Sequence, residues 1–456
     1  MDIRTETFRT LDELKDFIKK GIPTFYHGSR TSTVIPYEKM DEFGDKHGWE
    51  KFTFGNLSSL TPELSLDGSM NQVIRGPITW QEARLFCRAK GRNTMTAPTE
   101  ELACILSGVA TSCTGERCFG YGTLRDQVVR LTYLNHEGES IELSSEKLLI
   151  NHVLFEDESA KTLLLNYQAE YENYKDFKNA PFPRMQVESD LMIGTEGQLG
   201  LVVEGVFNTV PLENVTYIFM ALPKWEEDYS IHLDLFERVQ NYRDKVYSCE
   251  LIDENSWSYL SPEKIPLVGK DIVFLEVETE HFESIYEDVV SKVKGLDPES
   301  VFEIPESKCR GLRMEIPRAI FEVNTKMGVT KKGTDVQVRA KDFGDLLEKY
   351  REMSKIGVPY NLFGHFGDAH LHFNFMPKAN EEDKCQQSLE RLYHWVKVKK
   401  GSPFAEHGIG LLKQHFIKPF YGQKQYDLFS YLKEQMDPKG IFFPEGFLNM
   451  SEDSID

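Results

Sequence analysis

The chain of 456 residues is long enough for two or three domains, and its 40% apolar and 28% charged residues are ordinary for a globular protein. Its formal net charge of −20 argues against binding to nucleic acid or to an anionic membrane surface, which both need clustered lysine and arginine. No apolar stretch reaches the roughly 18 residues of a membrane span, and the N-terminus lacks the apolar core of a signal peptide, so we expect a cytoplasmic protein. The seven cysteines form no CxxC pair, so neither a zinc knuckle nor an iron–sulfur cluster is predicted.

The first two hundred residues mix helical and extended patterns. "LDELKDFIKKG" (11–21) and "ITWQEARLFCRAKG" (78–91) have helical apolar spacing, and "PTFYHGSRTSTVIPY" (23–37) is typical of an extended run. The block 101–126 is dense in small residues, which indicates backbone packed closely against another element or a ligand. "QVVRLTYLNHEGESIEL" (127–143) predicts two strands joined by a turn.

A glycine-rich turn follows, and the predicted pattern of secondary structure changes after it. "DLMIGTEGQLGLVVEGVF" (190–207) has GxxGxxG spacing, which is not the GxGxxG fingerprint of a dinucleotide-binding Rossmann fold. Beyond about residue 210, the runs 216–223 and 271–278 predict strands, and 225–243 and 281–295 predict amphipathic helices. This alternation favours an α+β domain with helices packed on a sheet.

The stretch "GHFGDAHLHFN" (364–374) holds three of the chain's twelve histidines. If 369–375 is a strand, His370, His372 and Asn374 share one face, and His365 precedes them across a tight turn. Such a turn and strand can bring His365 and His372 to one point. The alternative is that these are ordinary hydrogen-bonded histidines.

A second stretch, "AEHGIGLLKQHF" (405–416), places Glu406 and His407 just before two glycines and a predicted helix. Taken alone, Glu406 could serve only as a solvated helix start, where the helix dipole favours a carboxylate. Taken with the first stretch, His365, His372 and Glu406 form a set of three ligands that leaves an open position, as catalytic metal sites do. The ion could be Zn²⁺, Mn²⁺, Fe²⁺ or Co²⁺, and His407 stays free as a nearby base.

These two stretches resemble the paired C-terminal signatures of the FAD-linked oxidases of the vanillyl-alcohol oxidase type, in particular the D-lactate, D-2-hydroxyglutarate and glycolate dehydrogenases. Other segments match in the same order. "YHGSRTST" stands at the position of the diphosphate loop, "APTEELACILSGVATSCTG" resembles a flavin loop, and "DLMIGTEGQLG" resembles a second flavin turn. "VTKKGTDVQV" and "DPKGIFFPEGF" resemble a substrate-side strand and the C-terminal motif.

The resemblance implies an α+β fold with two parts. An FAD-binding domain of two subdomains, the N-terminal one shortened, takes residues 1–209. A cap domain with an antiparallel sheet covered by helices, which carries the metal and substrate site, takes 210–430. The segment 431–456 returns to the FAD domain.

The same resemblance implies roles for individual residues. His365, His372 and Glu406 correspond to metal ligands, and His407 to the base that takes the substrate's hydroxyl proton. Arg313 and Lys331 correspond to groups that hold the substrate carboxylate, and His370 is a further polar group of the site. The positions that correspond to the flavin-binding loops are Gly28, Ser29, Thr31, Ser32, Pro98, Thr99, Gly108, Gly115, Gly194, Glu196, Gly197 and Gly200.

The flavin-binding loops also depart from the family pattern. Ser29 and Arg30 replace glycines of the diphosphate loop, where backbone N–H groups approach phosphates closely. Leu106 and Ser107 replace two glycines of the next loop. Phe443 replaces an asparagine of the C-terminal motif.

The resemblance therefore implies an FAD-dependent, metal-assisted dehydrogenase that oxidises a small 2-hydroxy acid, D-lactate-like, to the 2-oxo acid. Electrons would pass to a quinone, a cytochrome or an electron-transfer protein, and a homodimer is one assembly open to the chain. The altered glycines leave an alternative, in which the chain keeps the metal-binding cap, has lost the flavin and acts as a non-catalytic binding protein.

Overall fold

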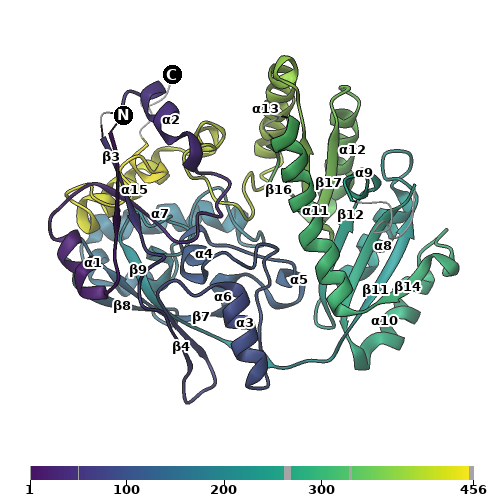
Figure 1. The fold of residues 1–456 in the computed structure, drawn as a ribbon, viewed down its shortest axis with the longest axis horizontal. Coiled ribbons are helices and arrows are strands. Elements are labelled where there is room, and N and C mark those ends of the chain that lie inside the picture. The colour runs from purple at the N-terminus through teal and green to yellow at the C-terminus, as the bar shows by residue number, and fades with distance from the viewer. Residues whose placement is uncertain (1, 50, 261–268, 328–330, 451–456) are drawn as a thin grey trace.

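The computed structural model describes residues 2–49, 51–260, 269–327 and 331–450, and the chain forms two halves that lie side by side (Figure 1). We call residues 2–211 the N-terminal half and residues 215–398 the cap. The last helix, α15 (Gln423–Met436), packs on α7 (Glu158–Tyr171) of the N-terminal half, where the yellow end of the chain lies beside the blue part in Figure 1. The chain therefore crosses into the cap and returns.

The N-terminal half contains two main sheets. In the first, β1 (Asp2–Thr7) and β2 (Thr24–His27) each pair in parallel with β3 (Lys51–Asn56). The second is antiparallel, and its strands in spatial order are β4 (Glu63–Leu66), β5 (Gln72–Arg75), β9 (Leu201–Phe207), β7 (Val128–Leu134) and β8 (Ser140–Ser144). A short pair joins β6 (Arg92–Thr94) to β10 (Thr209–Pro211).

The helices of this half are set by local signals as well as by packing. In α1 (Leu11–Ile18) the residue Thr10 caps the first turn and Glu13 returns a bond to the backbone, which is a capping box. In α3 (Trp80–Ala89), Thr79 and Glu82 form the same motif. The remaining helices are α2 (Met40–Lys46), α4 (Ile105–Thr111), α5 (Cys118–Tyr121), α6 (Leu124–Gln127) and α7.

The cap is built on one antiparallel sheet of eight strands. Their order is β14 (Val301–Ile304), β11 (Val215–Leu222), β13 (Asp271–Glu278), β12 (Val246–Ile252), β17 (Tyr360–His365), β18 (His370–Phe375) and β15 (Lys332–Gly333), with β16 (Val336–Gln337) also on β18. The central strands are buried along nearly their whole length, as expected for a sheet covered on both faces. The α+β class predicted for the chain is confirmed.

Helices cover the cap sheet and connect it to the N-terminal half. They are α8 (Ser230–Val239), α9 (Glu254–Trp257), α10 (Phe282–Asp288), α11 (Glu306–Met327), α12 (Phe343–Ser354) and α13 (Glu382–Val398), followed by α14 (Gln414–Ile417). The side of α11 that faces the N-terminal half is tied to it by ion pairs, with Arg310 bound to Glu101 and Glu306 bound to Arg88. No helix in the described ranges is long and apolar enough to cross a membrane.

The predicted elements are mostly present, and the differences fall at their ends. The strand predicted at 271–278 is β13, but the helix predicted at 225–243 begins only at Ser230. Of the extended run 23–37, only the first part is a strand, because the chain then turns into the cavity described below. The domain boundaries predicted after residues 209 and 430 stay predictions.

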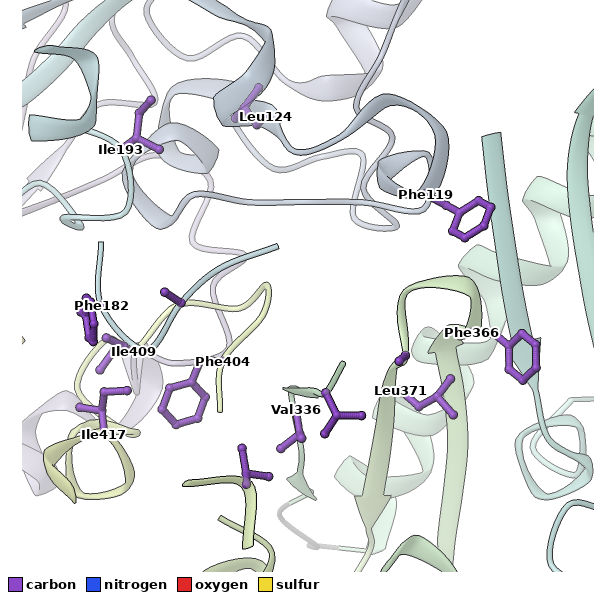
Figure 2. Packing of buried hydrophobic residues seen from close by; sticks show 14 of the residues in the cluster. Phe119, Leu124, Phe182, Ile193, Val336, Phe366, Leu371, Phe404, Ile409 and Ile417 are labelled. Atoms are coloured by element: carbon purple, nitrogen blue, oxygen red, sulfur yellow. The ribbon is translucent and has the colours of Figure 1, made fainter. Parts of the chain in front are cut away.

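One of the four buried apolar clusters of the described chain runs through both halves. Figure 2 shows Phe119 and Phe366 near the junction, with Phe404, Ile409 and Ile417 further along. Phe119 of α5 lies so close to Gly367 of the cap that a Cβ added there would come within 2.6 Å of its ring. The two halves are therefore packed against each other.

Candidate active site

A cavity of about 460 Å³ lies between the two halves. The N-terminal half contributes loops around residues 25–37, 98–116 and 196–202, and the cap contributes residues from β12, β13, α11, β17 and β18. Glu406, His407, Gly410 and Phe443 complete the wall. Every residue of the two histidine-containing stretches that was predicted to bind metal or act as base lines this cavity, together with most of the predicted flavin-loop residues.

The hairpin of β17 and β18 sets the positions of the histidines. Its turn, Phe366–Asp368, ends at Ala369, whose φ of 51° lies in the left-handed region. This turn pairs His365 directly with His370 and leaves His372 two residues further along β18. His372 and His365 then both reach Glu406 Oε2, with His365 Nε2 at 2.9 Å and His372 Nε2 at 3.5 Å.

The charges around His365 suit a cation. Its Nδ1 donates to Glu250 Oε1 at 2.9 Å, and Glu250 comes from the neighbouring strand β12. Burial opposes the charged imidazole, but Glu250 and Glu406 outweigh it and raise the pKa of His365 to about 9. Carboxylates that hold a proton on His365 would also stabilise a divalent ion at the same place, but His365 is not among the residues whose ligand atoms all lie within 4.8 Å of one another.

His407 lies beside this cluster, stacked on the His372 ring with centroids 4.8 Å apart. Its Nδ1 is 3.6 Å from Asp335 Oδ2, which also accepts the backbone N–H groups of Glu406 and His407. Burial lowers the pKa of His407 to about 3, while Asp335 opposes that shift. The imidazole is therefore neutral near pH 7, with Nε2 as the nitrogen left available to accept a proton.

The predicted site residue His370 is not on the cavity wall. Its side chain is fully buried, and Nε2 donates to Asp335 Oδ1 at 2.9 Å. Asp335, His370, His372 and Glu406 offer ligand atoms within 4.8 Å of one another, which makes a second candidate metal set. Both sets share His372 and Glu406 and differ in whether His365 or the Asp335–His370 pair completes them.

The two predicted carboxylate-binding cations both line the cavity, with different neighbours. Burial and the nearby Lys413 lower the pKa of Lys331 to about 8, and Asp335 opposes that shift. Arg313 lies on α11 and contacts Glu116 of the N-terminal half. This contact with a protein carboxylate was not predicted from the sequence.

Most of the predicted flavin-loop positions lie on the cavity wall, and three do not. Those that line it are Gly28, Ser29, Thr31, Ser32, Pro98, Thr99, Gly108, Glu196 and Gly197. Gly115 instead packs on the backbone of residue 97, where an added Cβ would come within 2.6 Å, and Gly200 packs on Tyr133. Gly194 forms a turn at φ 78°. These three glycines therefore allow tight turns and close packing in the loops but do not line the cavity.

Two residues that depart from the family pattern are accommodated by the surrounding loops. Arg30 has φ 56°, and its guanidinium lies over the rings of Tyr37 and Phe54 at 5.7 and 5.2 Å. Phe443 has φ 43° and packs edge-on against Phe25 at 4.6 Å. Both residues line the same cavity. We call the part of its wall formed by the loops around residues 25–37, 98–116 and 196–202 and by Phe443 the flavin-side wall, because the predicted flavin loops lie there. This wall carries more side-chain bulk and charge than the family pattern predicts.

Three charged residues of the site were missed by sequence reasoning. Glu250 interrupts the buried strand "VYSCELI", and an acid inside such a strand is a signal of function or pairing that could have found it. Asp335 and Glu116 lie in loops whose local sequence gives no such signal. Only the folded chain shows that they face His407 and Arg313.

Comparison with known proteins finds similarity to one family. Residues 237–445 match the family described as FAD linked oxidases, C-terminal domain. A putative mitochondrial D-lactate dehydrogenase of Schizosaccharomyces pombe is 28% identical over 284 residues, covering 56% of this chain and 52% of that protein. A mitochondrial D-2-hydroxyglutarate dehydrogenase of Arabidopsis thaliana is 28% identical over 272 residues, covering 56% of this chain and 47% of that protein.

A third relative, a mitochondrial D-lactate dehydrogenase [cytochrome] of Kluyveromyces lactis, is 22% identical over 82% of this chain and 62% of its own length. The chain thus spans about half the length of the first two relatives. Two solved structures of alkyldihydroxyacetonephosphate synthase match with TM-scores of 0.63 and 0.66 at 14% and 13% identity, over 96% of this chain and 76% of theirs.

These structures show a shared fold. Residues 237–445 match the C-terminal domain of the FAD-linked oxidases, and the resemblance inferred from the motifs is confirmed.

Proposed function

We propose that this chain is an FAD-dependent oxidoreductase that oxidises a small 2-hydroxy acid to the 2-oxo acid. The observation that carries the proposal is the meeting of two residue sets in one cavity. His365, His372 and Lys331 come from the cap, Glu406 and His407 come from the segment that follows it, and the loops at 28–32 and 196–197 come from the N-terminal half. A substrate held between them lies between a proton acceptor and the place expected for a flavin ring.

Each cap residue has a distinct part in this proposal. Lys331, whose side chain is exposed, holds the substrate carboxylate through its positive charge. His407 accepts the hydroxyl proton on Nε2, while Asp335 keeps Nδ1 turned away from the substrate. Glu250 orients His365, in the way that a carboxylate commonly fixes a metal-binding imidazole.

The groups that such a site would hold are FAD and one divalent metal ion. When bound, FAD supplies the two-electron acceptor and the metal ion supplies a Lewis acid near the hydroxyl group. His365, His372 and Glu406 would hold the ion. The diphosphate loop at 28–32 and the turn at 196–197 would hold the flavin. The relatives named as D-lactate and D-2-hydroxyglutarate dehydrogenases support a hydroxy acid as substrate.

The test is a screen of purified protein with D- and L-2-hydroxy acids, an artificial electron-accepting dye, added FAD and divalent metals. We expect dye reduction with at least one 2-hydroxy acid and none with the matching 2-methoxy acid, which has no hydroxyl proton to give to His407. Equal rates with the hydroxy and methoxy acids, or no rate with any hydroxy acid, would refute the proposal.

A second candidate is favoured by the altered flavin loops. Arg30 and Phe443 place bulk and charge in the cavity where family members have smaller residues, so the chain could keep the metal cluster and bind a small acid without flavin chemistry. The flavin spectrum separates the two candidates. Protein that is yellow, or becomes so with added FAD, supports the enzyme. Colourless protein that takes up no FAD but binds metal supports the binding protein.

A further inference from the structure

The loop that carries Glu406 and His407 is bound by one carboxylate from each half of the molecule. We call residues 406–410 the base loop. Asp335 of the cap accepts the backbone N–H groups of Glu406 at 3.2 Å and of His407 at 2.8 Å. Glu196 of the N-terminal half accepts the backbone N–H groups two and three residues beyond His407. The base loop is therefore attached to both halves, and the attachment to Glu196 is the first one after His407.

The Glu196 carboxylate takes its hydrogen bonds from the base loop. Its Oε1 accepts from the N–H of Ile409 at 2.6 Å and of Gly410 at 3.1 Å, and its Oε2 accepts from the N–H of Gly410 at 3.0 Å. Within the described ranges no other hydrogen bond reaches this carboxylate, although Glu196 lines the cavity. Bonds from backbone N–H groups to a charged carboxylate are stronger than those between neutral partners. The side chain of Glu196 is thus engaged by the base loop.

The base loop needs this support because two of its five residues are glycines. Gly408 directly follows His407 with φ 77°, and Gly410 has φ 54°. Glycine adopts many backbone conformations at similar energy, so the glycines do not by themselves fix the direction of the His407 ring. Asp335 fixes the backbone before Gly408, and Glu196 fixes it after Gly408. The fit is close, because a Cβ added to Gly408 would lie 2.7 Å from Glu196 Oε1.

The turn that carries Glu196 is itself held in place. The backbone N–H of Glu196 donates to Ala110 O at 2.8 Å, and that of Gly194 donates to Val109 O at 3.1 Å, so the turn is attached to α4. Glu196 has φ 54°, a left-handed conformation that residues with a side chain adopt only where the surroundings impose it. The carboxylate therefore extends toward the base loop from a fixed backbone.

We propose that Glu196 is a positioning residue for His407. Its carboxylate fixes the base loop beyond Gly408, so that Nε2 of His407 stays directed toward the substrate. This inference rests on the proposed function. It differs from the role that the sequence resemblance implied for Glu196, because it assigns the side chain to the base loop and leaves only the backbone of the turn at 196–197 to the flavin.

The first test is Glu196→Leu, which removes both acceptor oxygens at similar size. In the dye assay kcat should fall by at least about tenfold, because a catalytic group displaced by about 1 Å can cost up to about 10²-fold. KM and the affinity for FAD should each stay within about threefold of the wild type. Glu188→Leu is the matched control, because it removes a buried carboxylate that accepts the backbone N–H of Ser144 and does not line the cavity. It should keep the wild-type kcat.

Two further variants separate positioning from general damage. Glu196→Gln keeps one acceptor oxygen for the base loop, so its kcat should lie between those of the wild type and Glu196→Leu. When Glu196→Leu is added to His407→Asn, the remaining kcat should change by less than about threefold, because residues that act as a unit are not additive. A further loss of about tenfold, or a Glu196→Gln variant as slow as Glu196→Leu, would overturn the inference.

Hydrogen exchange gives a readout that does not depend on turnover. A peptide that spans the base loop, analysed by mass spectrometry, should exchange at least about tenfold faster in Glu196→Leu and at the wild-type rate in Glu188→Leu, because lost hydrogen bonds expose their N–H groups. If no hydroxy acid is oxidised, the proposed function fails, and faster exchange still supports the attachment of the base loop by Glu196. Unchanged exchange in Glu196→Leu, or unchanged exchange together with loss of FAD binding, would overturn the inference.

Discussion

The two walls of the cavity are built differently. On the cap wall, the histidine cluster is held by regular hydrogen-bonded strands and by buried carboxylates, with Glu250 on His365 and Asp335 on His370 and on the loop of His407. On the flavin-side wall, loops carry the site, and three non-glycine residues that line it have left-handed backbone, namely Arg30, Glu196 and Phe443, whereas the cap hairpin has one such residue, Ala369, in its turn. A left-handed conformation costs most residues roughly 1–2 kcal/mol.

The difference shows which part of the site can vary. On the cap wall the histidines of the hairpin have carboxylate partners, so a change at one position leaves a buried charge or imidazole without its bond. On the flavin-side wall, loops absorb Arg30 and Phe443 by packing them on aromatic rings. We therefore expect substitutions in the cap wall to abolish function and substitutions in the flavin-side loops to tune it.

The largest effect is expected for His372→Asn. His372 belongs to both candidate metal sets, so its loss should remove the ion, about one per chain, and reduce turnover to background. Metal analysis by mass spectrometry and the dye assay measure the two outcomes. His281→Asn is the control, because it removes a histidine from a surface acidic cluster and should keep the metal in the cavity.

A companion variant decides between the two candidate sets. His370→Asn should keep the ion if His365, His372 and Glu406 are the ligands, and should lose it if Asp335 and His370 complete the set. A His372→Asn variant that retained metal and activity would exclude both sets.

His407→Asn should lower kcat by about 10²–10⁴-fold, the usual contribution of a general base, while metal and flavin content stay unchanged. Only the proton acceptor is lost, because the backbone bonds of this loop to Asp335 do not involve the side chain. His415→Asn, outside the cavity, should keep the wild-type rate and is the control. Loss of the metal in His407→Asn would identify His407 as a ligand instead.

The cap wall was largely predictable from the sequence, for a physical reason. The alternation in "HLHFNF" and the tight turn before it fix strand register, and register alone places His365 and His372 near each other. The paired glycines after His407 similarly mark a loop that can present Glu406. The spacing does not show which imidazole faces the cavity. His370 turns away from it because it is hydrogen-bonded to Asp335, which lies 35 residues earlier in the chain.

The flavin-side wall was predictable only in outline. The loops at 28–32 and 196–197 line the cavity, but Gly115 and Gly200 serve packing, which residue type alone does not reveal. The contact of Glu116 with Arg313 joins elements about two hundred residues apart, and no local pattern encodes it. Long-range contacts of this kind follow from how the cap docks on the N-terminal half.

A smaller effect is expected at Lys331, where the pKa is lowered to about 8 by burial. The ammonium form binds the substrate carboxylate and is present below pH 8, so kcat/KM should fall as the pH rises through about 8. Lys331→Arg should move this fall to higher pH, because arginine stays charged. Lys331→Ala should raise KM by roughly 10–100-fold, as expected for loss of a charged hydrogen bond of about 1.5–3 kcal/mol.

The adjacent Lys332 is a matched control for this prediction. Its ammonium is near Glu382, and it does not line the cavity, so Lys332→Ala should keep both KM and the pH profile. A fall in kcat/KM above pH 8 that persists unchanged in Lys331→Arg would show that another group titrates there.

The smallest effect is expected on the flavin-side wall, for Arg30→Gln. This change removes a charge beside the diphosphate loop but keeps a long side chain in the same left-handed backbone, so the strain of φ 56° is unchanged. Arg30 is exposed, and an exposed charge contributes about 0.2–1 kcal/mol, so FAD should bind roughly 1.5–5-fold more weakly. Quenching of flavin fluorescence measures the affinity without any turnover.

Because solvent ions screen such a charge, the difference should shrink at about 1 M salt, and Arg30→Lys should retain the wild-type affinity at low salt. A loss of flavin binding as complete as the metal loss expected for His372→Asn would show that this loop is as intolerant of change as the cap wall.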